Sequence, residues 1–225
     1  MDKIEIVAGL ILLALAISWI IRKVVINRLL KQLYDAAYVQ KDRETFMLLI
    51  SSLQSQMTIS EVSRNIMTLN AAIAWDDLET VKTTAGKLIS THLKDAEART
   101  VYGRTIGYLC EKRDSQAIMF LEKMQEYFKG NNDMNIILML YDIQLVYDIY
   151  IEKKAERRTD LIELAESAQE DNAKAVYQYR LAVLDHSLGN KEESRKELKK
   201  ALENTDNARD RRKIERILEG EWDLL

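Results

Sequence analysis

From about residue 26 onward, apolar residues recur at the spacing of amphipathic helices, and short polar stretches interrupt them. After each break comes a triplet of apolar or small residues at positions i, i+4 and i+7, which share one face of a helix. Successive triplets begin about 35, 36, 44 and 33 residues apart. They are Phe46/Ile50/Leu53, Val81/Ala85/Leu88, Ala117/Leu121/Met124, Leu161/Ala165/Ala168 and Ser194/Leu198/Ala201. The period predicts about five helix pairs, with each triplet on the second helix of its pair.

The first helix of each pair is expected at about 26–40, 60–75, 95–112, 133–152 and 173–188. The breaks that follow are polar: Lys41-Asp42, Asp76-Asp77, Arg113-Asp114, Lys153 to Glu156, and Gly189-Asn190. Aspartate favours the start of a helix because its carboxylate accepts from free backbone N–H groups, and glycine suits the left-handed residue that ends one. The chain has no proline and only seven glycines, which argues against the many turns of an all-β fold. The fold class is therefore predicted to be all-α.

The C-terminal segment from Ala208 to Leu218 has apolar residues only at Ile214, Ile217 and Leu218. That pattern predicts a solvated capping helix for the open end of a helical stack. The last residues, 220–225, are expected to fray or to dock through Trp222. No linker rich in glycine or serine interrupts the chain, so the predicted organisation is an anchor (1–26), a repeat domain (27–219) and a tail (220–225).

The segment from Ile6 to Ile21 carries no charged residue. Its 16 residues cover roughly 24 Å as a helix, and apolar neighbours extend residues 4–26 toward the ~30 Å of a hydrocarbon core. The prediction is one transmembrane helix that continues directly into the first repeat. A cleaved signal peptide is an alternative, because Ala14-Leu15-Ala16 matches the small-residue cleavage pattern. A buried soluble helix is a further alternative, although the segment has no polar face.

Charge on the two sides of this segment predicts its orientation. Four cations lie just after it and are candidate lipid contacts: Arg22, Lys23, Arg28 and Lys31. Before it stands one lysine among two acids. The positive-inside rule therefore predicts a single-pass membrane protein whose C-terminal body is cytoplasmic.

The segment from Tyr177 to Ala201 resembles a tetratricopeptide repeat. Leu181 and Ala182 match the Leu-Gly positions, Gly189 matches the turn glycine, and Ser194, Leu198 and Ala201 match the small, aromatic and late-alanine positions. Gln178 and Asp185 depart from the motif, and its closing proline is missing. The resemblance implies a right-handed α-solenoid whose first helices line a concave groove for a protein or peptide. In this repeat the implied groove residues are Val176, Tyr179, Val183 and His186.

Few residues suggest catalysis. The two histidines, His92 and His186, are far apart in sequence and have no cysteine near them, so no metal site is expected. Cys110 lies on a predicted apolar face, where we expect it to be a small, buried hydrophobic residue. Phosphate-binding glycine loops and hydrolase or metalloprotease motifs do not occur in the sequence. We therefore expect no enzyme activity, no catalytic residue and no cofactor.

Two further segments have more than one interpretation. The stretch from Met134 to Ile151 is apolar enough to suggest a second span, but it contains two aspartates, and a central helix covered on several sides is the prediction. The basic cluster at 209–216 is interrupted by acids and is expected to be a solvated face, with lipid contact as an alternative. The net charge of -3 does not suggest nucleic-acid binding.

These observations favour a membrane-anchored cytoplasmic scaffold or adaptor that binds a protein or peptide partner in the groove of a solenoid. The alternative is an extracytoplasmic repeat subunit, signal-anchored or secreted, of a secretion or envelope-assembly machinery. The sequence does not name the partner.

Overall fold

A computed structural model describes residue 19 and residues 22–225, and throughout those residues it contains helices and no strand. The predicted all-α class is therefore confirmed for the described chain. The chain forms two compact units, Met1–Val101 and Tyr102–Leu225. Of the predicted anchor, residues 1–18 and 20–21 lie outside the described residues, so the transmembrane helix stays a prediction.

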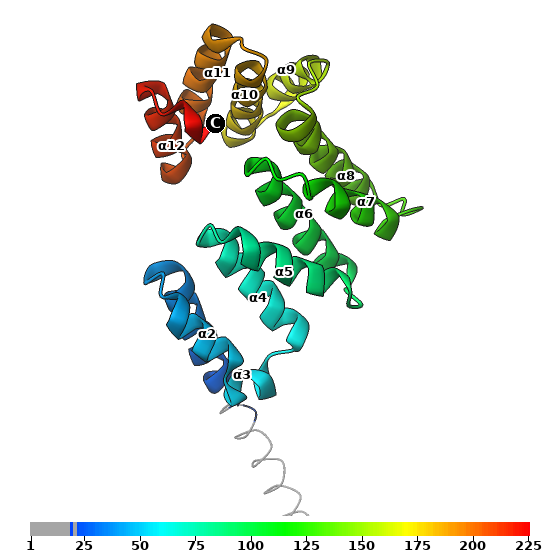
Figure 1. The fold of residues 1–225 in the computed structure, drawn as a ribbon, viewed down its shortest axis with the longest axis vertical. Coiled ribbons are helices and arrows are strands. Elements are labelled where there is room, and N and C mark those ends of the chain that lie inside the picture. The colour runs from blue at the N-terminus through cyan, green and yellow to red at the C-terminus, as the bar shows by residue number, and fades with distance from the viewer. Residues whose placement is uncertain (1–18, 20–21) are drawn as a thin grey trace, which may run out of the picture. The chain divides into compact units, whose positions relative to one another are not determined.

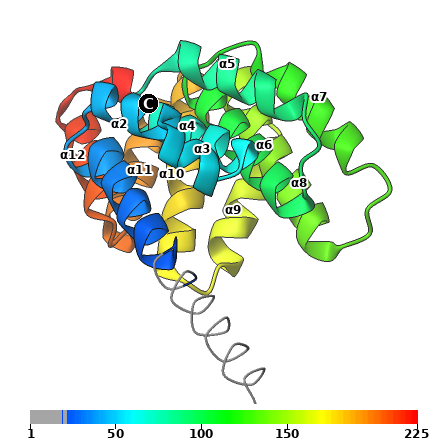
Figure 2. The same ribbon diagram turned by 90° about the horizontal axis from the view of Figure 1, so that it is seen from below.

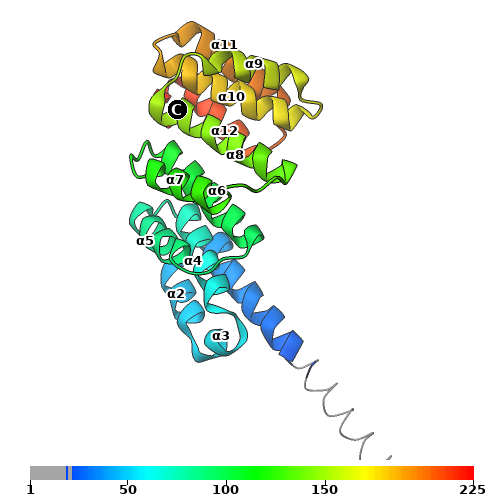
Figure 3. The ribbon, with the colours of Figure 1, turned by 90° about the vertical axis from the view of Figure 1, so that its right-hand side faces the viewer.

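The first unit begins with a helix over residues 22–34, which runs on into a short π-helical segment (Figures 1 and 3). Its elements are η1 (Asp35–Val39), α2 (Arg43–Ser51), α3 (Leu53–Thr58), α4 (Glu61–Ala74), α5 (Leu78–Ile89) and the beginning of α6 (Asp95–Glu111). Both α2 and α4 pack against η1, and α4 packs against α5. The core of the unit includes Leu29, Leu33, Phe46 and Ile50.

The second unit contains the remainder of α6 and all later elements. They are α7 (Ala117–Tyr127), α8 (Met134–Tyr147), η2 (Asp148–Glu152), α9 (Arg157–Ser167), α10 (Asp171–Ser187), α11 (Lys191–Asn204), α12 (Ala208–Glu219) and η3 (Trp222–Leu224). Helix α10 packs against α9, α11 and η2, and α11 packs against α12, as Figure 2 shows for α10, α11 and α12. Helices next to each other in sequence thus pack together within this unit.

A left-handed residue stands in the turn of every predicted helix pair. These residues are Lys41, Asp76, Arg113, Lys153 and Gly189, with positive φ angles of 54°, 60°, 53°, 53° and 86°. Each ends the first helix of its pair, as left-handed residues commonly do. Because four of the five are not glycine, the helices on either side must hold them in this conformation. All five predicted turns are therefore present at the predicted positions.

The five turns are of two kinds. In the second, third and fifth turns a backbone amide donates to the carbonyl five residues earlier, as Asp77 N–H does to Ala72 (2.9 Å). In the first and fourth turns the acceptor lies six residues earlier, as in Lys154 N–H to Asp148 (3.0 Å). Those two turns follow η1 and η2, so the π-helical segments accommodate one additional residue.

Most of the predicted triplets form the buried faces of the second helices. Those of α5, α7 and α11 are buried throughout, including the polar Ser194, whose hydroxyl donates to the Ala182 carbonyl of α10 (2.8 Å). Leu53 is a wrong assignment, since its side chain is 72% exposed. Ser52 adopts an extended conformation and starts a new helix, which turns Leu53 away from the face of Phe46 and Ile50.

The prediction for the fourth triplet, on α9, is only partly correct, whereas the prediction for the C-terminal capping helix, α12, is confirmed. In α9 only Leu161 of its triplet is buried, because Ala168 already lies past the helix end. In α12, Ile214 and Ile217 are buried and the opposite side is exposed, as expected for a solvated helix. Trp222 docks by stacking on His186, with ring centroids 5.2 Å apart, and Leu225 is buried. The tail is thus packed against the second unit.

Candidate functional site

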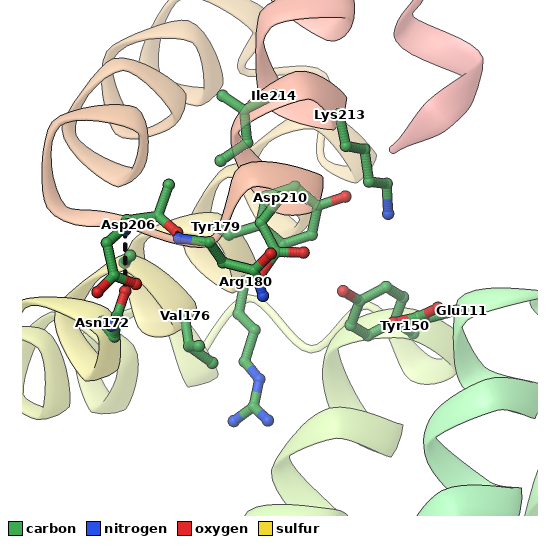
Figure 4. Close-up of a pocket in the computed structure, with 13 residues that line it drawn as sticks. Glu111, Tyr150, Asn172, Val176, Tyr179, Arg180, Asp206, Asp210, Lys213 and Ile214 are labelled. Carbon is green, nitrogen blue, oxygen red and sulfur yellow. Dashed lines mark hydrogen bonds between the residues drawn. The ribbon is translucent and has the colours of Figure 1, made fainter. Parts of the chain in front are cut away.

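A pocket of about 480 Å³ opens beside α10 in the second unit (Figure 4). Helix α10 turns Leu181, Ala182 and Leu184 into the protein. Its residues on the pocket side are Asn172, Ala175, Val176, Tyr179 and Arg180. Residues from other elements complete the wall: Glu111, Tyr150, Thr205, Asp206, Asn207, Asp210, Lys213 and Ile214. Its volume falls within the roughly 300–1,000 Å³ that is usual for ligand sites.

The Tyr179 hydroxyl is a buried polar group of the pocket that makes no hydrogen bond, although the ring itself is partly exposed. Burial raises the pKa of Tyr179, with the charges of Glu111 and Asp210 adding to the effect, so the hydroxyl stays protonated at neutral pH. It can therefore both donate and accept a hydrogen bond. Lys213 Nζ lies 5.0 Å from the centre of the Tyr179 ring, and both side chains extend into the same region (Figure 4).

Charge in the pocket is uneven. Three carboxylates line it, from Glu111, Asp206 and Asp210, against the two cations of Arg180 and Lys213. Arg180 is already held by Asp142 on α8, with Nη1 2.5 Å from Oδ1, and its guanidinium also lies over the Tyr177 ring. The pocket therefore carries an excess of negative charge, which favours a ligand with basic or amide groups.

Two of the four predicted groove residues line this pocket and two do not. Val176 (47% exposed) and Tyr179 lie on its wall. Val183 is only 1% exposed, so it faces the interior and offers no surface to a partner. His186 lies outside the pocket and stacks on Trp222. Burial lowers the pKa of His186, and the charges of Lys191 and Arg113 lower it further.

Comparison with protein-family models, curated proteins and solved structures finds no match for this chain. The site is therefore interpreted from its own geometry.

The pocket residues outside α10 were not predicted from sequence. Tyr150, Asp206 and Lys213 reach the pocket from η2, from the turn after α11 and from α12. Asp206 N–H donates to Asn172 Oδ1 (3.1 Å), and this bond joins that turn to the first turn of α10. A period of hydrophobic residues indicates which face of a helix is buried, but it does not indicate which polar residues of other helices meet there.

Helix α8 exposes a stripe of large apolar side chains. It was predicted to be covered on several sides, but Met134, Ile137, Leu138 and Tyr141 are exposed, and their i, i+3, i+4, i+7 spacing places them on one stripe. Among the described residues, Met134–Glu152 is the one helical stretch long and apolar enough to cross a membrane, and 44% of it is buried in the protein. The two aspartates within it are both ion-paired, Asp142 with Arg180 and Asp148 with Lys154 and Arg157.

The four predicted lipid contacts are exposed on the N-terminal helix: Arg22, Lys23, Arg28 and Lys31. Lys23 Nζ lies 5.2 Å from the ring centre of Trp19, which is itself exposed. Between residues 22 and 34 the chain has no acidic residue, so this helix presents positive charge alone.

The remaining candidates for chemistry are Cys110 and His92. Cys110 is buried, and burial raises the pKa of its thiol to about 12, so the reactive thiolate is not formed at neutral pH. His92 is exposed. In the described part of the chain, His, Cys, Asp and Glu side chains do not gather into a group of three or more that could hold a metal ion.

Proposed function

We propose that this chain is a membrane-anchored scaffold, in which a tetratricopeptide-like stack of helix pairs binds a protein partner in the pocket against α10. Five successive hairpins, each with a left-handed residue in its turn, support the repeat architecture. The uncharged run from Ile6 to Ile21 and the cations that follow it support the anchor.

The observation that carries the binding proposal is the Tyr179 hydroxyl. A buried polar group without a hydrogen bond destabilises a protein by about 1–3 kcal/mol, and this hydroxyl is one of four such side-chain atoms in the described chain. It differs from the others in lining a pocket beside the exposed apolar side chain of Val176. The hydroxyl oxygen has no exposed surface, so a peptide segment would pack an apolar side chain on Val176 and bond to the hydroxyl through a backbone or amide group once the Tyr179 ring shifts.

The excess of carboxylates narrows the class of partner. Asp206 and Asp210 line the same pocket as Val176, and both lie close to the N-terminal end of α12. A basic residue adjacent to the apolar one would pair with them, whereas an acidic segment would be repelled. The proposed ligand is therefore a protein segment that combines an apolar and a basic side chain.

Tyr179→Phe is expected to weaken this binding without destabilising the free protein. The substitution removes only the unpaired hydroxyl, so the free energy of unfolding should stay equal or rise, while one partner hydrogen bond, worth about 1 kcal/mol, is lost. A photo-crosslinking side chain at position 176, used in intact membranes, should give a discrete adduct whose yield falls about fivefold in the variant.

Tyr177→Phe is the matched control, because it makes the same change on the same helix outside the pocket. Its adduct yield should equal that of the wild type. Equal yields from all three proteins, or an adduct no stronger than one from the exposed position 199, would argue against the pocket as the binding site.

The cytoplasmic side is a separate proposal, supported by the cations at 22–31. A green fluorescent protein fused after Leu225 should fluoresce, and an alkaline phosphatase fused there should be inactive. The reverse result would favour the alternative of an extracytoplasmic subunit of a secretion or envelope-assembly machinery.

A further inference from the structure

The second helix of the first hairpin is broken in two and exposes large apolar side chains in both halves. Leu53 and Met57 of α3 are each 72% exposed, and they lie four residues apart on one helical face. Met47 and Leu48 of α2 are exposed as well. Soluble surfaces seldom carry this many large apolar groups within a dozen residues, so the segment indicates an interaction site.

The same segment contains no charged residue over the 16 positions from Thr45 to Ser60. Three of its hydroxyls bond to its own backbone: those of Ser51, Ser52 and Thr58 donate to the carbonyls of Met47, Leu49 and Gln54 at 2.6, 2.7 and 2.7 Å, whereas the buried Ser55 hydroxyl has no partner. Such bonds lower the free energy needed to remove the hydroxyls from water. The segment is therefore suited to an environment poorer in water than the cytoplasm.

Satisfied backbone groups extend to the break and to the end of α3. Gln56 Nε2 donates to the Ser51 carbonyl (2.8 Å) at the break between α2 and α3. Arg64 Nη1 donates to the Ile59 carbonyl (2.7 Å), just after α3 ends. A helix end facing lipid needs such partners because water is scarce there.

The fold places α3 at the end of its hairpin from which the chain leads toward the uncharged N-terminal segment. Residues 22–40 run away from that end for about 28 Å at helical rise, and α2 (residues 43–51) returns over about 14 Å before the break that leads into α3. In Figures 1 and 3, α3 lies at the end of the first unit where the described chain begins. If residues 4–26 span a bilayer, α3 lies at the depth of its headgroups.

The N-terminal helix carries positive charge that suits contact with the same lipid surface. Arg22, Lys23, Arg28 and Lys31 are exposed, and the first acid of the described chain is Asp35. Each cation near an anionic lipid surface contributes attraction that decays within a Debye length. Cations beside an uncharged apolar helix are the two components of an interfacial membrane contact.

We propose that α2 and α3 dock on the bilayer, with Leu53 and Met57 inserted among the headgroups beside the anchor. The occupant of this apolar face is thus the lipid surface itself, and the proposal rests on the proposed membrane anchor. The first hairpin then has two attachments to the membrane, which would fix its tilt and orient the helices that follow.

The test uses full-length protein reconstituted into vesicles of phosphatidylcholine and phosphatidylglycerol in equal parts. Cys110, which is buried, is replaced by alanine, and an environment-sensitive nitrobenzoxadiazole label is attached at a single cysteine, at position 53 or 57. The control carries the label at position 39, where an exposed valine (67%) lies in the same unit at the other end of the hairpin. Lipids with a spin label near the headgroup should quench the labels at 53 and 57 about threefold more than the label at 39.

The possible outcomes separate this proposal from the anchor on which it rests. Quenching at 53 and 57 no stronger than at 39, in protein that resists alkaline extraction, would overturn the docking and leave the anchor in place. Protein that is extracted by alkali would overturn the anchor itself. A blue shift that depends on protein-to-lipid ratio, without quenching, would assign the face to a second copy of the chain and also overturn the proposal.

A double variant without any label tests the same docking through protease sensitivity. Leu53→Glu with Met57→Glu should leave the helical circular dichroism unchanged, because both side chains are exposed. In vesicles the pair should make the α2–α3 segment several-fold more sensitive to protease, whereas Val39→Glu, at the other end of the hairpin, should not. Equal protease sensitivity of the double variant and the wild type would contradict the docking.

Discussion

Leu198→Asp is expected to unfold the hairpin of α10 and α11. Leu198 is completely buried at the centre of the α11 face that packs on α10. The substitution removes a buried leucine, at about 2–5 kcal/mol, and adds a carboxyl group that has no partner there. The total approaches the 5–15 kcal/mol stability of a typical domain. Hydrogen exchange should show lost protection in α10 and α11, and protease should cleave within them.

Lys199→Asp is the matched control for this prediction. It places the same side chain on the next residue of the same helix, where the position is exposed. Its effect on the free energy of unfolding should stay within about 0.5 kcal/mol. Full protection of α10 and α11 in Leu198→Asp would contradict the packing of α11 as described.

Asp148→Asn is expected to destabilise the second unit by about 3 kcal/mol. Asp148 is fully buried in the fourth turn and accepts from Gln144, Lys154 and Arg157, with Arg157 Nη2 2.6 Å from Oδ2. An amide of the same size cannot neutralise the two cations, and its N–H₂ group would face donors. Urea denaturation followed by circular dichroism measures the loss.

The same carboxylate predicts a pH dependence. Burial raises its pKa, but the hydrogen bonds from Lys154, Gln144 and Arg157 outweigh burial and hold the pKa below its usual value. Its stabilising contribution is therefore complete above the unfolded pKa of about 4 and is lost as pH falls through the lower folded value. The difference in unfolding free energy between wild type and Asp148→Asn should be constant near neutral pH and shrink below about pH 4.

Asp160→Asn serves as the control because Asp160 binds the same arginine, Arg157 Nη1, at 2.8 Å but lies partly exposed. Exposed ion pairs contribute about 0–1 kcal/mol, so this variant should lose much less stability. Similar losses in Asp148→Asn and Asp160→Asn would indicate that burial of Asp148 adds nothing to its role.

Particular residues show which features of the fold could be predicted from the sequence and which could not. The turns at Asp76-Asp77 and Gly189-Asn190 were predicted because their chemistry is local: Asp77 accepts from Thr80 N–H (3.1 Å) and Gly189 takes the left-handed conformation. Asp185 was read as a departure from the repeat motif. In the structure it is buried and binds Arg158 Nε at 2.9 Å, an ion pair between residues 27 positions apart. Nothing in a single sequence identifies such a partner.

The candidate site was likewise predicted only in part. Val176 and Tyr179 were expected in a groove because of the resemblance to a tetratricopeptide repeat, and both line the pocket. Val183 was expected there on the same ground but is buried, and His186 stacks on Trp222 instead. The sequence did not place the tail on α10, because that contact joins residues 36 positions apart through one aromatic pair.

The sequence by itself determined the all-α class and the positions of the hairpin turns in this protein, since helical periodicity and turn chemistry depend on residues only a few positions apart. Only the tertiary structure decided which faces stay exposed, which carboxylates are buried in ion pairs, and which buried hydroxyls have no hydrogen-bond partner. Those properties depend on packing between helices distant in sequence, and the free energy of each contact exists only once both helices are in place.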